Sequence, residues 1–199
     1  MSRMFTAGFA ALALSAVPSV ALAHTGVGDT HGFMHGFSHP IGGLDHVLAM
    51  VAVGMFAAYL GGRALWLVPA TFVLMMAVGG ALGIAGAPVP FVELGIAASV
   101  IVLGLAVALQ WHVPTAAAAA LAGFFAIFHG HAHGAEIPAG VSGLEYALGF
   151  MFATAVLHAV GAGIGLGFSQ VGARISRAAL QAGGGAVALA GVAILTGYL

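Results

Sequence analysis

The sequence predicts an all-α membrane protein, a compact bundle of six transmembrane helices that follows an N-terminal signal peptide. The first observation is composition: the chain is 62% hydrophobic and 5% charged, whereas soluble domains carry about 25% charged residues. The second is a mean hydropathy of +1.15. The third is that the apolar runs are about 20 residues long, the length that crosses the hydrocarbon core of a bilayer.

Residues 1–23 have the pattern of a secretory signal peptide. Arg3 is the positive n-region, residues 4–17 form a short apolar region, and Ala21-Leu22-Ala23 fits an A-x-A cleavage site. The alternative is an uncleaved first helix, and both place the next residue on the outer side. Cleavage after Ala23 makes His24 the N-terminus, where a free amine and an imidazole together would bind a cation.

Apolar runs between glycine and proline breakers define six candidate spans in a transmembrane domain over residues 44–199. A histidine-rich periplasmic segment at 24–43 precedes this domain. Glycine and alanine are frequent in the spans, which favours close helix packing in lipid. The six spans are 44–60, 65–85, 91–109, 115–133, 144–167 and 178–198.

The arginines predict the orientation of the spans. If the mature chain starts outside, the loops that carry Arg63, Arg174 and Arg177 are cytoplasmic, and Arg3 is retained inside as well. This arrangement satisfies the positive-inside rule. We therefore expect a multi-pass protein of the bacterial inner (cytoplasmic) membrane whose mature N-terminus and C-terminus are both periplasmic.

The first group of candidate ligands lies at the outer mouth of the first span. Ten histidines are present in this otherwise apolar chain, and ionisable groups in lipid usually have a function. Pro40 and two glycines are expected to bend the chain so that His39 folds back toward Asp45 and His46. One carboxylate and two imidazoles suit Ni²⁺, Co²⁺, Zn²⁺ or Cu²⁺. The alternative for Asp45 is a helix cap.

The second group ends the fourth span, on the same outer side. His129 and His133 are four residues apart and share a helix face, and Glu136 follows within reach. His131 points elsewhere unless the flanking glycines unwind the turn. The alternative is a polar loop at the surface.

Further polar residues are scattered along the spans. Glu145 begins the fifth span, in a run that echoes the start of the first span and hints at an internal repeat. His158 either carries an ion inward or hydrogen-bonds a backbone carbonyl. His112 is an interfacial anchor or an exit ligand, and Glu93 is expected to cap its helix. The outer histidines, His24, His31 and His35, are expected to collect metal.

These motifs resemble those of the HupE/UreJ family of bacterial nickel/cobalt permeases. The family has a histidine, five residues and then Asp-His, which here are His39 and Asp45-His46. It also has a Phe-His-Gly-x-Ala-His-x-x-Glu run, which residues 128–136 match. The resemblance covers nearly the whole chain. It implies functional roles for His129, His133 and Glu136, with His131 in the variable slot.

The resemblance implies a secondary transporter that takes Ni²⁺ or Co²⁺ from the periplasm to the cytoplasm, and we expect the membrane potential to drive it. Zinc or copper remains possible, because selectivity depends on geometry. The alternative is a non-transporting accessory protein that delivers nickel to hydrogenase or urease maturation proteins. The candidate metal ligands are His24, His39, Asp45, His46, His129, His131, His133, Glu136, Glu145 and His158.

Composition restricts the remaining partners and activities. Four basic residues leave no basic patch, so no nucleic-acid partner is expected. The chain has no cysteine, which removes thiolate ligands and cysteine nucleophiles. No nucleotide-binding motif is present. We therefore expect no enzyme and no tightly bound cofactor, with the metal ion and the lipid bilayer as partners; a membrane metalloenzyme using Glu136 as a general base is the remaining rival.

Overall fold

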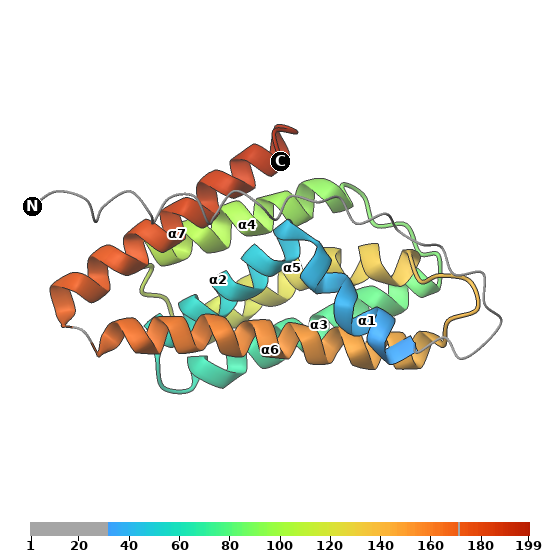
Figure 1. Cartoon of the computed structure of the whole chain (residues 1–199), viewed down its shortest axis with the longest axis horizontal. Coiled ribbons are helices and arrows are strands. Elements are labelled where there is room, and N and C mark those ends of the chain that lie inside the picture. The colour runs from blue at the N-terminus through green and yellow to red at the C-terminus, as the bar shows by residue number, and fades with distance from the viewer. Residues whose placement is uncertain (1–31, 171) are drawn as a thin grey trace, which may run out of the picture.

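The computed structural model describes residues 32–170 and 172–199, and within them all regular structure is helical (Figure 1). The predicted all-α class is confirmed. The predicted signal peptide, His24 and His31 lie outside the described residues. The helices are α1 (Gly32–Gly42), α2 (Leu44–Leu60), α3 (Ala64–Ile84), α4 (Val92–Ala108), α5 (Thr115–Ala135), α6 (Gly143–Ser169) and α7 (Ala173–Leu195).

Four of these helices, α3, α5, α6 and α7, are long and apolar enough to cross a membrane. Helices α1 and α2 meet at an angle of 84° and count as a fifth span if the bent pair crosses as one unit. Helix α4 has 17 residues and is a shorter apolar helix. The chain is thus a multi-pass membrane protein by length and composition, while the number of six spans remains a prediction.

The segment before α2 departs from the sequence-based expectation. A bend at Pro40 and two glycines was expected at the end of the histidine-rich segment 24–43, and no helix was predicted there, yet Gly32–Gly42 forms a helix that includes Pro40. The bend itself occurs at Gly43, whose backbone is extended (φ −97°, ψ 120°). A glycine pair has low helix propensity, which explains why the helix breaks there. Helix α1 then packs along α6, where Gly36 lies against the Tyr146 carbonyl.

The bundle is built from helix pairs in direct backbone contact. In the α3–α5 pair, Gly130 lies against the carbonyl of Met76 and Gly134 against that of Gly80, so the two helices run parallel. In the α2–α6 pair, Gly54 lies so close to the His158 carbonyl that a β-carbon would clash with it. Glycine permits this approach because it has no side chain. Figure 1 shows the third pair, α4 and α7, along one edge of the bundle, with α6 and α1 along the other.

The interior and exterior of the bundle differ in a way that suits lipid. Large side chains such as Phe56, Phe72 and Met50 are fully buried between the helices. Other large apolar side chains, including Leu74 and Phe124, face outward and are more than half exposed. A soluble protein would not leave so many unpaired apolar residues on its surface. The polar exceptions in the interior are mostly histidines, and these define the candidate site.

Candidate metal site

Three histidine rings from two helices converge in the interior. His46 comes from the first turn of α2, and His129 and His133 come from consecutive turns of α5. Nε2 of His46 lies 2.9 Å from Nδ1 of His129 and 2.5 Å from Nε2 of His133. The three side chains are buried, with exposures of 4%, 0% and 7% respectively. We call this group the three-histidine cluster.

Asp45 determines which nitrogen of His46 faces the cluster. Its Oδ1 lies 3.0 Å from Nδ1 of His46 and also accepts the His46 backbone N–H at 2.8 Å. An ionised carboxylate only accepts, so Nδ1 of His46 carries the proton and donates it. Nε2 of a neutral His46 therefore presents a lone pair to the cluster. This carboxylate–histidine arrangement is typical of metal sites.

Ser99 of α4 likewise determines which nitrogen of His129 carries the proton. The Ser99 hydroxyl donates to the Ile96 carbonyl at 2.6 Å, so it accepts from Nε2 of His129 at 2.8 Å. Nδ1 of a neutral His129 is then the unprotonated nitrogen. The sequence analysis did not identify Ser99, because a single serine in an apolar helix has no spacing partner that marks it.

Two lone pairs consequently face each other in the interior. Neither His46 Nε2 nor His129 Nδ1 has a proton to share when both rings are neutral, although they lie 2.9 Å apart. A cation between them would satisfy both. Metal–nitrogen bonds of about 2.0–2.1 Å place two ligands at a right angle roughly 3 Å apart, which the observed spacing matches. The donor set, imidazole with nearby carboxylate, suits divalent Ni, Co, Zn or Cu.

A polar pocket of about 430 Å³ leads to the cluster from the end of the bundle where α2 begins. His39 lies there with its Nε2 3.9 Å from a Glu136 carboxylate oxygen. The centroids of the His39 and His133 rings are 4.7 Å apart. His39, His133 and Glu136 have ligand atoms within 4.8 Å of one another. His39 lines the same pocket as Asp45 and His46, but its closest ring contact is with His133 of α5. His133 belongs to both groups.

Glu93 also lines this pocket, together with Asp45 and Glu136. Capping was the expected role for Glu93, but no side-chain hydrogen bond caps α4, and its N-cap is Phe91. The N-cap of α2 is likewise Gly43, without a side-chain capping bond, so Asp45 does not occupy the capping position. Three carboxylates therefore line the entrance, and together they favour the approach of a cation.

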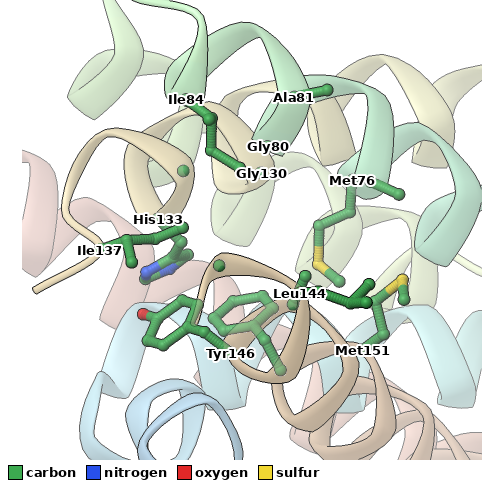
Figure 2. Close-up of a pocket in the computed structure, with 15 residues that line it drawn as sticks. Met76, Gly80, Ala81, Ile84, Gly130, His133, Ile137, Leu144, Tyr146 and Met151 are labelled. Carbon is green, nitrogen blue, oxygen red and sulfur yellow. The ribbon is translucent and has the colours of Figure 1, made fainter. Parts of the chain in front are cut away.

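An apolar cavity of about 270 Å³ lies on the other side of His133, between α3, α5 and α6. Figure 2 shows His133 beside the ring of Tyr146 at one side of this cavity, with Met76 and Met151 at the other. Within the described part of the chain, the buried Nδ1 of His133 and the buried hydroxyl of Tyr146 have no hydrogen-bond partner.

The structure does not bring every predicted ligand to the cluster. Helix α5 continues through Ala135, so His131 points away and its Nε2 lies 2.8 Å from the Ala87 carbonyl oxygen. Glu145 is exposed and lies against Gly32 of α1. His158 is buried but lies farther along α6.

The chain is similar to known proteins over nearly its whole length. Residues 12–194 match the family described as HupE / UreJ protein. The chain is similar to Protein HupE of Rhizobium leguminosarum bv. viciae, with 49% identity over 187 residues that cover 94% of this chain and 95% of the relative. No solved structure matches the chain.

Proposed function

Because the chain belongs to the HupE/UreJ family, we propose that it is a secondary transporter that carries Ni²⁺ or Co²⁺ from the periplasm into the cytoplasm. The substrate ion is held by imidazole and carboxylate groups near the outer face. One observation carries the proposal: His46 and His129 direct unprotonated nitrogens at each other in the buried interior. His133 can donate a hydrogen bond to Nε2 of His46 but not to Nδ1 of His129, so a cation between the rings is the partner that satisfies both nitrogens.

The residues suggest an order of events. Asp45, Glu93 and Glu136 attract the hydrated ion into the polar pocket. His39 and Glu136 replace some of its water, and His133, which contacts His39 and His46, passes it to the three-histidine cluster. Asp45 is adjacent to the cluster, so its carboxylate offsets part of the charge of the ion as water is removed.

The membrane potential supplies enough energy for inward movement. Moving one charge across 100 mV corresponds to about 2.3 kcal/mol. A divalent ion doubles this to about 4.6 kcal/mol, which corresponds to a concentration ratio on the order of 10³. Proton coupling is therefore not needed for accumulation.

The proposal is tested with the full chain reconstituted alone into liposomes. Radioactive nickel uptake should depend on the protein and rise when an inside-negative potential is imposed with a potassium gradient. Competition by cobalt, zinc and copper then ranks the substrates. Nickel binding without any uptake would contradict transport and would favour the accessory role, in which the cluster delivers the ion to a maturation protein.

Matched variants connect the uptake to the cluster. His129→Ala and His46→Ala should each lower uptake to near the background of empty liposomes while the protein still inserts and purifies normally. Phe124→Ala, a change on the exposed face of α5, serves as the control and should retain uptake within about two-fold. Normal uptake by both histidine variants would refute the site.

A further inference from the structure

His158 is a second buried polar group that the three-histidine cluster does not use. Its side chain is 2% exposed. Within residues 32–170 and 172–199, neither of its ring nitrogens has a hydrogen-bond partner. The sequence-based alternative, a bond from His158 to a backbone carbonyl, is therefore not found there. A buried imidazole without partners costs free energy, so its presence calls for an explanation.

His158 lies on the face of α6 that leads away from the cluster. Tyr146, Phe150, Thr154 and His158 follow at four-residue intervals, and all four are buried. The centroids of the Phe150 and His133 rings are 4.3 Å apart, so Phe150 lies beside the three-histidine cluster. His158 lies eight residues farther, about 12 Å along the helix. Thr154 stands between them and donates its hydroxyl to the Met76 sulfur at 3.7 Å.

Phe72 of α3 separates the two histidine positions. Its ring centroid is 5.7 Å from that of His129 and 5.1 Å from that of His158. The side chain is fully buried. An ion that leaves His129 in the direction of His158 must therefore displace or pass one aromatic ring, whose face is attractive to cations.

Beside His158, an open groove of about 500 Å³ runs between the first half of α3 and the middle of α6, and exposed residues such as Leu74 line its outer edge. Pro69 lines it, and because proline has no N–H, the carbonyl of Leu65 on the same wall lacks its usual helical donor. Small side chains, including Ala155 and Ala159, form the α6 wall. The groove extends toward the end of α3 that begins beside Arg63.

We propose that His158 is a second coordinating position for the transported divalent cation, separated from the three-histidine cluster by the Phe72 ring. This inference rests on the proposed transport function and extends it inward. The ion leaves His129, passes Phe72 and binds an unpartnered nitrogen of His158. From His158 it continues toward the cytoplasmic ends of the helices.

The first test replaces His158 by an apolar residue of similar size. His158→Leu removes the coordinating nitrogens while filling the space, and Val156→Leu, at a position that is 40% exposed on the same helix, is the control. Nickel uptake into liposomes should fall about ten-fold or more in His158→Leu. Equilibrium nickel binding at the three-histidine cluster, measured by calorimetry in detergent, should stay near wild type, and so should the thermal unfolding temperature, because no hydrogen bond is lost.

The second test uses the absence of cysteine from the chain. His158→Cys introduces a single thiol, which is a soft ligand for Cd²⁺. If the substrate passes this position, low Cd²⁺ concentrations should block nickel uptake in His158→Cys and leave Val156→Cys unaffected. A purely structural histidine would not produce this block, so the test remains decisive if His158→Leu folds poorly.

The outcomes separate the two proposals. Uptake by His158→Leu within about two-fold of wild type, or no cadmium block in His158→Cys, overturns the role of His158 and leaves transport standing. Absence of uptake by the wild-type chain overturns transport and this inference with it. Loss of uptake with retained nickel binding, together with a cadmium block, supports both.

Discussion

The Ser99 hydroxyl accepts a hydrogen bond from Nε2 of His129 across an interval of 30 residues, at 2.8 Å. Because Ser99 donates its own proton to the Ile96 carbonyl, it determines the tautomer of His129 and not merely the position of the ring. Helix α4 thus contributes to the site without providing a ligand.

Ser99→Ala should weaken metal binding while leaving all three histidines in place. Removal of a residue that orients a metal-binding histidine typically lowers affinity about 10–100-fold. Calorimetric titration of Ni²⁺ into the purified protein measures the change, and Ser99→Thr, which keeps the hydroxyl, is the matched comparison. Equal affinities for the alanine variant and the wild type would contradict the tautomer argument.

His131 and His133 should respond in opposite ways to alanine substitution. His133 contacts both His46 and His39, so His133→Ala should nearly abolish nickel uptake. His131 bonds the Ala87 carbonyl outside the cluster, so His131→Ala should keep uptake within about two-fold, with a modest loss of thermal stability. Uptake assays on the pair in liposomes test this, and an equal loss in both variants would place His131 on the ion route.

Uptake should decline as the external pH is lowered. Imidazoles bind metal only when unprotonated, so protons and the ion compete for the same nitrogens. Lower pH adds protons to the lone pairs that the ion needs, so the expected direction is loss of uptake on acidification. The measurement compares nickel uptake from about pH 5 to pH 7.5 at a clamped membrane potential. Constant uptake across this range would argue against imidazole ligands.

The carboxylates that line the polar pocket should affect the nickel concentration needed for uptake more than the maximal rate of uptake. Glu93 and Glu136 are exposed residues lining the polar pocket, and their charge raises the local cation concentration. The double variant Glu93→Gln, Glu136→Gln should raise the nickel concentration for half-maximal uptake several-fold, with a smaller change in the maximal rate. The difference from wild type should shrink as salt is added, because salt screens exposed charge. A salt-independent loss of maximal rate would instead place these groups in the transfer step.

Helix contact at Gly130 should limit stability. A β-carbon there would clash with the Met76 carbonyl, so Gly130→Ala should destabilise the protein by about 1–3 kcal/mol through overpacking. A β-carbon at Gly163 would meet no neighbouring helix or side chain within 4 Å, and Gly163→Ala should be neutral or stabilise by about 0.5–1 kcal/mol. Thermal unfolding in detergent compares the two variants. A stable Gly130→Ala protein would show that α3 and α5 separate easily.

Much of the fold follows from the order of apolar runs and breakers. Helix α2 has the predicted bounds of 44–60, and α3 begins and ends one residue before the predicted 65–85. Helix α1 could not be predicted in the same way, because its eleven residues contain several glycines and a proline. Its helical form depends on packing against α6, where Gly36 and Gly149 allow close contact. That information lies in a segment more than a hundred residues away.

The histidines of the cluster could be predicted from the sequence, but the residues around them that come from α4 could not. Helical spacing places His129 and His133 on one face and His131 on another, as the structure shows. Ser99 and Glu93 have no motif around them, and their roles depend on how α4 lies against α2 and α5. The spacing of residues within one helix carries no information about such contacts between helices.

The arrangement of parallel helix pairs has a mechanical consequence. Helices α3 and α5 hold each other by glycine–carbonyl contacts, as do α2 and α6, whereas α2 and α5 touch little beyond the histidine rings. His46 belongs to the α2–α6 pair, whereas His129 and His133 belong to the α3–α5 pair. An ion bound by all three histidines would therefore link the two helix pairs. Under the proposed transport function, sliding of one helix pair past the other would separate these histidines and release the ion.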